Sequence, residues 1–185
     1  MIDDTLEELK TGIQKAQDSL RRELARIRTG RANANILDTI RVDYYGTPTP
    51  LKQVASISVP EARLIVLKPF DRTQIGAIEK AIASGNLGVN PSNDGELIRI
   101  PMPPLTEERR KELTKVARAK GEDAKVAIRA ARHEAKDMID ALQKDGDVGE
   151  DVADRGKKEM EEIVKAGTSR VDEIVEKKEK DIMEV

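Results

Sequence analysis

Basic side chains repeat along one stretch of the chain with a spacing that suits phosphate binding. Between residues 109 and 136 there are ten Lys and Arg but only four Asp and Glu, although the whole chain has a net charge of -2. At about 100° per helical residue, five of these share an arc of roughly 60°: Arg118, Lys125, Arg129, Arg132 and Lys136. We call these five residues the basic stripe, and Arg110 lies near its boundary. A guanidinium can hold a phosphate through two parallel hydrogen bonds, so the stripe predicts binding to a polyanion.

The composition narrows the kind of polyanion. A row from Arg110 to Arg132 would extend for roughly 33 Å on a helix, whereas aromatic residues make up only 2% of the chain. The stacking platforms of single-strand readers are therefore missing, and the stripe favours folded RNA recognised through its backbone and shape. A plainer alternative is that Lys and Arg alternate with Glu on an exposed helix for solubility.

The residues and motifs that several common classes of enzyme require are absent from the sequence. The chain has one histidine, no cysteine and neither of the glycine-rich fingerprints of nucleotide-binding loops, so catalytic triads, zinc sites and nucleotide hydrolysis lack their residues. His133 is interpreted as a surface residue. We expect a non-enzymatic protein without a cofactor or metal. The absence of cysteine, an acidic N-terminus unlike a signal peptide and the lack of a long apolar run predict a cytoplasmic protein that does not enter a membrane. We also expect a monomer.

The basic stripe lies on a predicted helix over residues 106–144. Pro103 and Pro104 end the preceding segment, and Thr106 can cap a helix with acids in its first turn. At 1.5 Å per residue this helix would be about 60 Å long. Its apolar seam is predicted to consist of Leu113, Val116, Ala117, Ala124, Ala127, Ala131, Ala135, Met138 and Leu142.

Two more long helices are predicted at the ends of the chain. The first has apolar residues at steps of three and four from Ile2 to Ile27 and is expected to end at residues 28–31. The third begins near Val148, with these residues facing inward: Val152, Met160, Ile163, Gly167, Val171, Ile174 and Ile182. Three amphipathic helices predict a bundle.

The middle of the chain alternates instead with the period of strands. Strands are expected at residues 40–44, 54–59, 63–68 and 97–100, with a short helix that Asp71 caps and Gly85 closes, and a tight turn at residues 93–95. The predicted fold class is α+β. A discontinuous three-helix bundle of residues 1–30 and 105–185 carries an inserted β/α/β domain of residues 31–104.

Two short linkers must join these domains. We expect hinges at residues 29–31 and 101–105, although two ordinary connections in a rigid corner remain an equal alternative. The candidate hinge residues are Thr29, Gly30, Arg31, Pro103, Pro104 and Leu105.

Several ordered motifs resemble those of the bacterial ribosome recycling factor family, from end to end of the chain. The residues that carry the resemblance are Arg28-Thr29-Gly30-Arg31-Ala32, Val42-Asp43-Tyr44-Tyr45-Gly46, Val59-Pro60-Glu61, Ile78-Glu79-Lys80-Ala81-Ile82, Asn93-Asp94-Gly95 and Leu105-Thr106-Glu107-Glu108-Arg109-Arg110-Lys111-Glu112-Leu113. The family often has an arginine at the position of His133 and a proline at that of Ala34.

The resemblance implies an L-shaped protein that binds the post-termination ribosome. Elongation factor G, through its own GTP hydrolysis, would help it to split the subunits and release mRNA and tRNA. Family arginines that contact large-subunit rRNA match Arg110, Arg129 and Arg132. We add Arg118, Lys125 and Arg28 as further candidate rRNA-binding residues.

Two other functions remain as alternatives to RNA binding. A coiled-coil adaptor could bind another protein through the acidic third helix or the apolar edge of the bundle. A hydrolase based on paired carboxylates is a more distant third.

Overall fold

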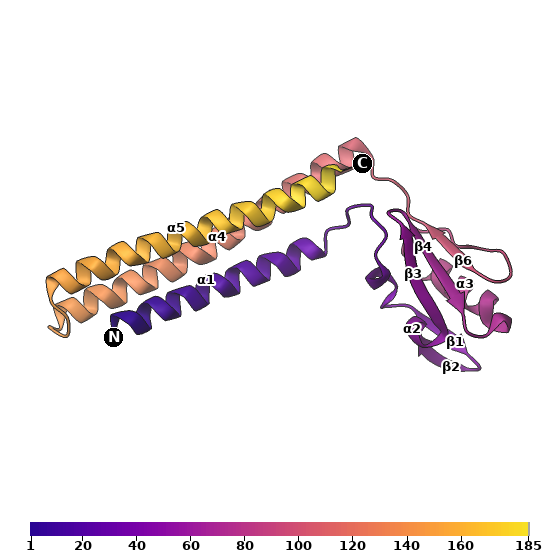
Figure 1. Cartoon of the computed structure of the whole chain (residues 1–185), viewed down its shortest axis with the longest axis horizontal. Helices are drawn as coiled ribbons and strands as arrows, with labels where there is room; N and C mark the ends of the chain where they lie inside the picture. Colours follow the sequence, from indigo (N-terminus) through magenta and orange to yellow (C-terminus); the bar gives the residue numbers. More distant parts are fainter. Residues whose placement is uncertain (185) are drawn as a thin grey trace. The chain divides into compact units, whose positions relative to one another are not determined.

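The computed structural model describes residues 1–184, which form two compact units. One unit contains Met1–Thr29 and the chain from Glu107 onward, and the other is Gly30–Thr106. The first unit is entirely helical, whereas the second combines strands with short helices. The fold class is α+β, as predicted (Figure 1).

Three long helices make up the first unit: α1 (Ile2–Ala25), α4 (Glu107–Lys144) and α5 (Glu150–Met183). The six apolar residues predicted for the middle of the α1 seam are all buried: Leu6, Leu9, Ile13, Ala16, Leu20 and Leu24. The predicted end of α1 was wrong, because the helix stops at Ala25. Gly30 does adopt a left-handed conformation, with φ of 76°, but five residues beyond the helix.

The buried face of α4 differs from the predicted seam because Val116, Ala127 and Met138 are exposed. Ile128 and Ile139 are buried in place of the last two, whereas Ala117, next to Val116, was already part of the predicted seam. The buried residues of α4 are Leu113, Ala117, Gly121, Ala124, Ile128, Ala135 and Ile139. In α5, likewise, Val152 is exposed while Ala153 and Gly156 are buried. A single helical projection misplaces such positions because α4 packs against both α1 and α5, so its buried face lies between two seams.

Glycines allow the three helices to approach closely. A Cβ on Gly121 of α4 would lie 2.6 Å from Cγ2 of Val175 in α5, and one on Gly167 of α5 would lie 2.6 Å from Cγ2 of Ile13 in α1. The carbonyl oxygen of Gly167 also accepts a hydrogen bond of 3.1 Å from the buried Gln17 amide. Glycine is therefore needed at these positions for space rather than for backbone freedom.

The turn between α4 and α5 fixes the pairing of these two helices. Gly146 has a φ of 81°, which L-residues with a Cβ rarely adopt. The amide of Asp147 donates to the carbonyl of Leu142 (3.0 Å), and that of Gly146 donates to Gln143 (3.2 Å). These two hydrogen bonds form a Schellman motif that satisfies the end of α4.

The second unit contains two antiparallel sheets and a helix. The pair β1 (Arg41–Tyr44) and β2 (Thr47–Pro50) forms one sheet. The other has the order β3-β4-β6-β5, with bounds Ala55–Glu61, Leu64–Pro69, Ile98–Pro101 and Ser92–Asn93. Helix α3 (Ile75–Ser84) and the short α2 (Leu51–Val54) complete it, with 3-10 turns at Ala34–Leu37 and Arg72–Gln74. Its core includes Val42, Ile65, Leu67, Ile78, Ile98 and Ile100.

All four predicted strands are present, but the sequence did not indicate β2. Pro48 and Pro50 made this segment resemble a loop, whereas in the structure they pair opposite Asp43 and Arg41 in a two-stranded sheet. Proline is compatible with such an edge position because no second neighbour requires its missing N–H. The predicted turn at residues 93–95 is confirmed, since Gly95 has a φ of 88° and joins β5 to β6.

Asp71 connects two loops of this unit. Its carboxylate accepts hydrogen bonds from the backbone N–H (2.9 Å) and hydroxyl (2.6 Å) of Thr73, and from the hydroxyl of Tyr45 (2.5 Å). It therefore caps the 3-10 turn that leads into α3, close to its predicted role. These hydrogen bonds lower the pKa of Asp71.

Neither a membrane span nor a metal cluster is evident among the described residues. No helix within residues 1–184 is both long and apolar enough to cross a bilayer. In the same residues, no group of three or more His, Cys, Asp or Glu side chains could hold a metal ion.

The close approach at Gly167 leads to a stability prediction. Gly167→Ala should lower the free energy of unfolding by about 1–3 kcal/mol, because its Cβ would clash with the branched Ile13 side chain and separate α1 from α5. Gly76→Ala is the control, since α3 has open space there, and it should change stability by between zero and about +1 kcal/mol. Denaturant unfolding followed by circular dichroism measures both. Equal effects would show that glycine at residue 167 is not required for packing.

A second prediction concerns Asp140 of α4. Hydrogen bonds from Lys157 of α5 (2.6 Å) and Lys136 of α4 (2.9 Å) lower the pKa of Asp140 from 3.8 to about 2. Since the folded pKa is lowered, this contribution to stability is present above the unfolded pKa and is lost as pH falls towards about 2. Asp140→Asn should therefore lower the melting temperature at neutral pH, and its difference from the unchanged protein should shrink between about pH 4 and pH 2. A difference that stays constant with pH would contradict this assignment.

Candidate RNA-binding surface

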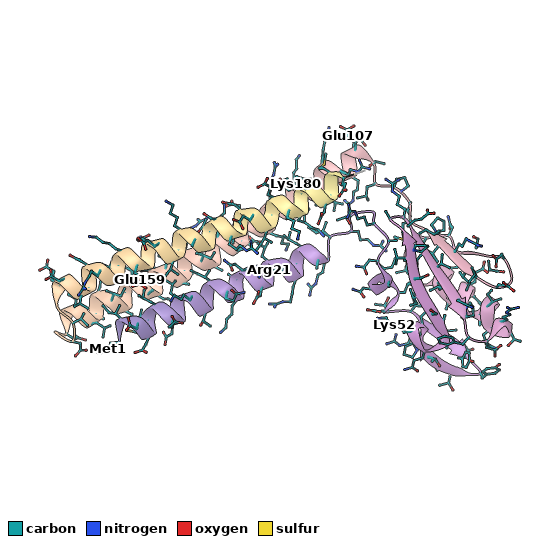
Figure 2. All side chains as sticks on the ribbon, viewed as in Figure 1. Met1, Arg21, Lys52, Glu107, Glu159 and Lys180 are labelled. Carbon is teal, nitrogen blue, oxygen red and sulfur yellow. The ribbon has the colours of Figure 1, made fainter. Side chains whose placement is uncertain are left out.

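Three members of the basic stripe lie at intervals of seven residues and reach across to α5. Arg118 pairs with Glu179, Lys125 with Asp172, and Arg132 with Glu161. A spacing of seven returns to nearly the same side of a helix, and α4 and α5 run antiparallel, so successive partners on α5 come earlier in the chain. These three residues therefore lie along the border between α4 and α5, two helices that Figure 2 draws with their side chains.

The ion pairs that Arg118 and Arg132 form with α5 also contain hydrogen bonds. Nε of Arg132 donates to both carboxylate oxygens of Glu161, at 3.0 and 3.1 Å, and Nη2 of Arg132 donates to the same carboxylate. Nε of Arg118 donates to Glu179, and its Nη2 lies 3.4 Å from the second oxygen of that carboxylate. Each guanidinium is therefore held by two of its nitrogens.

The lysine pair is arranged differently. Nζ of Lys125 lies 2.6 Å from Asp172 of α5 and 3.6 Å from Glu122 of α4. Here the lysine side chain is 22% exposed while Asp172 is 62% exposed. The acid rather than the base is the outer partner at this position.

The remaining two residues of the basic stripe pair within their own helix. Arg129 lies 3.7 Å from Glu122, and Lys136 lies 2.9 Å from Asp140. Arg110 is half-buried near the start of α4, where its charge contributes to the lowered pKa of Glu107, chiefly caused by Lys111.

The charged groups of the basic stripe lie at the surface, and each of the five is paired with an acid. The side chains of Arg118 and Arg129 are 66% and 63% exposed, and that of Arg132 is 37% exposed. The acids that pair with them were missed because three come from α5, and only the register between two helices brings them to α4. Glu122 and Asp140 were the partners that local spacing could have indicated, because they lie within seven residues of Lys125, Arg129 and Lys136 on the same helix.

The ion pairs keep the stripe charged. Hydrogen bonds donated to the paired carboxylates raise the pKa of Arg118, Lys125 and Arg132, and the hydrogen bond donated by Arg132 lowers the pKa of Glu161. Ion pairs at the surface typically contribute only about 0–1 kcal/mol each. The paired carboxylates can therefore give way to another anion at little energetic cost.

The border between α4 and α5 is also hollowed. Two adjoining hollows of about 600 and 350 Å³ open there, and Arg118 and Glu179 line both of them. Lys111, Lys115 and Lys180 add basic groups to the larger one. The α4 side of these hollows is mainly basic and the α5 side mainly acidic, with Glu122 of α4 and Lys180 of α5 as exceptions.

The other predicted site residues lie outside this ion-paired series. Arg28 is exposed in the segment that follows α1, and His133 is exposed with Nε2 3.6 Å from Asp137, which agrees with its interpretation as a surface residue. The predicted hinge residues lie at the two crossings of the chain between the units. A Cβ on Gly30 would lie 3.3 Å from Cγ of Leu105, so the two linkers touch.

Both linkers are also fixed to neighbouring points of the second unit. The amide of Ala32 donates a 2.6 Å hydrogen bond to the carbonyl of Ala62, and that of Met102 donates a 2.7 Å bond to Arg63. Ala62 and Arg63 are adjacent in the turn between β3 and β4. The linkers therefore leave the second unit from one place.

Known proteins resemble this chain over its whole length. The family model for ribosome recycling factor matches residues 20–183. Ribosome-recycling factors of Sorangium cellulosum (strain So ce56) and Saccharopolyspora erythraea are 57% and 53% identical over 185 residues, covering all of both chains. That of Anaeromyxobacter sp. (strain K) is 54% identical over 183 residues, or 99% of this chain and 97% of the relative.

Solved structures of the same family have a similar fold. A solution structure of ribosome recycling factor aligns with a TM-score of 0.70 and 37% identity, covering 100% of this chain and 98% of the other. T. thermophilus ribosome recycling factor, described with E. coli elongation factor G bound to the E. coli post-termination complex, aligns with a TM-score of 0.61 and 39% identity, covering 99% of each chain. The protein studied here therefore belongs to the ribosome recycling factor family, whose members are translation factors and not enzymes.

Proposed function

We propose that this protein binds the post-termination ribosome and, together with elongation factor G, separates its subunits so that mRNA and tRNA are released. Family membership carries the proposal, because relatives that share half or more of their residues with this chain over its full length are ribosome-recycling factors. The T. thermophilus relative is described with elongation factor G on the post-termination complex. Elongation factor G would supply GTP hydrolysis, and the reaction would take place in the cytoplasm.

The basic stripe, together with Arg110 and Arg28, is the proposed contact with large-subunit rRNA. The candidate residues are Arg110, Arg118, Lys125, Arg129, Arg132 and Arg28. Support comes from the exposure of Arg118, Arg129 and Arg132, and from partners at the surface whose ion pairs are weak enough to exchange for phosphate. Arginine suits this role because its planar fork matches a phosphate with two hydrogen bonds.

The two crossings of the chain are the proposed hinge. The hinge residues are Thr29, Gly30, Arg31, Pro103, Pro104 and Leu105. Support comes from the anchoring of Ala32 and Met102 at the adjacent residues Ala62 and Arg63. Two linkers that leave one point constrain the inserted unit less than two widely separated linkers would, so the unit can turn when elongation factor G pushes it.

The adaptor alternative has less support. Its binding surface would have been the acidic face of the third helix, but Glu161, Asp172 and Glu179 of α5 are turned towards basic residues of α4. These carboxylates are thus partly neutralised within the bundle.

Replacement of Arg132 tests the RNA contact. Arg132→Ala should weaken binding to isolated large ribosomal subunits by about 1–3 kcal/mol, because a charge-assisted contact is lost. Helicity and the melting temperature should barely change. Co-sedimentation at several salt concentrations measures the affinity, and the mutant should show a shallower salt dependence.

Arg170→Ala is the matched control for this test. Arg170 is a 56% exposed arginine of the same bundle and is paired with Glu173, but it lies outside the stripe. It should leave binding nearly unchanged. If both mutants bind as tightly as the unchanged protein, Arg132 does not contact the subunit.

A reversible crosslink tests both the hinge and the function. Cysteines at Gly30 and Leu105 would be the only two in the chain, and their disulfide would tie the touching linkers together. The oxidised protein should bind post-termination ribosomes normally but split them more slowly with elongation factor G and GTP. Reduction should restore the rate, and omission of elongation factor G or GTP should abolish it in both forms.

Light scattering of post-termination ribosomes follows this reaction. Equal splitting by the oxidised and reduced forms would mean that the linkers are only connectors. An unchanged protein that never splits ribosomes under these conditions would overturn the proposed function itself.

A further inference from the structure

The two arginines that reach α5 are held by the same edge of their guanidinium groups. In Arg132 the nitrogens Nε and Nη2 both donate to Glu161, and in Arg118 the same two nitrogens face Glu179. The two arginines are fourteen residues apart on α4, and their glutamate partners are eighteen residues apart on α5. The same mode of contact therefore occurs at two separate places along the border of these helices.

This arrangement leaves a second recognition edge open. A guanidinium has five N–H donors in a rigid fork, and a planar anion can be held either along the Nε and Nη2 side or along the Nη1 and Nη2 end. Glu161 and Glu179 occupy the side edges. Within residues 1–184, Nη1 of neither arginine has a hydrogen-bond acceptor.

We propose that Glu161 and Glu179 are positioning residues for RNA binding, which hold the side edges of Arg132 and Arg118 so that the end edges face a phosphate. This inference rests on the proposed function, in which the basic stripe binds rRNA. Each arginine would then bridge a carboxylate on α5 and a phosphate of the RNA.

Fixing an arginine before binding favours the complex. A free arginine on an exposed helix samples many rotamers, and ordering them on binding reduces the affinity. When a carboxylate of the same protein already accepts hydrogen bonds from two nitrogens of the arginine, the arginine loses part of this entropy during folding instead of during binding. The remaining fork is rigid, so its direction follows from the contact at the other edge.

The same carboxylates also repel phosphate, and the structure limits this effect. Glu179 is only 20% exposed while its partner Arg118 is 66% exposed, so the acid lies behind the base. At Glu161 the acid is the more exposed partner, at 51% against 37% for Arg132, but both of its oxygens accept hydrogen bonds from Nε of Arg132, which engages the negative charge. Lys125, which pairs with Asp172, has an ammonium group with no planar edge to orient. Positioning is therefore assigned to the two glutamates and not to Asp172.

The test depends on whether Glu161→Gln strengthens or weakens binding, because electrostatics alone and the positioning role predict opposite changes in affinity. Glu161→Gln removes a negative charge beside an RNA-binding surface, so simple electrostatics predicts tighter binding to large ribosomal subunits. If Glu161 positions Arg132, the mutant should bind about three- to tenfold more weakly, the range of coupling expected for side chains in contact. Glu162→Gln makes the same charge change at the next, exposed residue and should bind equally well or slightly more tightly.

A double-mutant cycle shows whether Glu161 affects binding through Arg132. The affinities of the unchanged protein, Glu161→Gln, Arg132→Ala and the double mutant are measured in one buffer, with circular dichroism melting to check that all four fold. Glu161→Gln should cause no loss in the Arg132→Ala background, because the arginine it positions is gone. The cycle of Glu179 and Arg118 should show the same pattern.

The outcomes are distinct. Tighter binding by Glu161→Gln in the unchanged background would show that the acid competes with RNA, and would overturn the inference. If Glu161→Gln reduces the affinity equally with and without Arg132→Ala, the mutation acts through the structure of the bundle and not through Arg132. This result would overturn the inference as well. If Arg132→Ala binds as tightly as the unchanged protein, the proposed RNA contact of Arg132 is wrong, and the positioning role that depends on it is wrong too. If Arg132→Ala weakens binding and Glu161→Gln does not, only the positioning role is lost.

Discussion

The close packing of α4 against α1 and α5 is the constraint on which the rest of the bundle depends. Gly121, Gly156 and Gly167 leave space for the side chains of Val175, Ile2 and Ile13. Branched side chains that fill the space above a glycine fix the position of one helix along another, because a shift in either direction would bring them against a Cβ. A single register for three long helices is the result.

That register determines the electrostatics of the candidate site. Residues 118, 125 and 132 of α4 meet acids of α5 only because the two helices run antiparallel in this alignment. Charged side chains that are paired at the surface remain in contact with water and are held in place, yet their ion pairs are weak enough to be replaced by phosphate. The packing of small residues inside the bundle thus controls which cations face outward and how each one is held.

The inserted unit follows a different principle. Its core is a sheet covered by aliphatic residues, and it is complete without the helical unit, since the side chains of Val42, Ile65, Leu67 and Ile78 bury one another. The chain enters and leaves near Ala62 and Arg63. An element with its own core and one point of exit can change its orientation without losing its packing, as the proposed hinge requires.

The sequence by itself determined the three long helices, four of the strands, the turn at Gly95 and the exposed row of basic residues, because these depend on local periodicity and on the φ angles that glycine allows. It could not determine the edge strand at Pro48 and Pro50, which requires a partner, or the burial of Ile128 and Ile139, which depends on two neighbouring helices at once. The pairing of Arg132 with Glu161, 29 residues away, was decided only by the tertiary structure. Periodicity shows which side of a helix is polar, but the register between helices decides which charges meet.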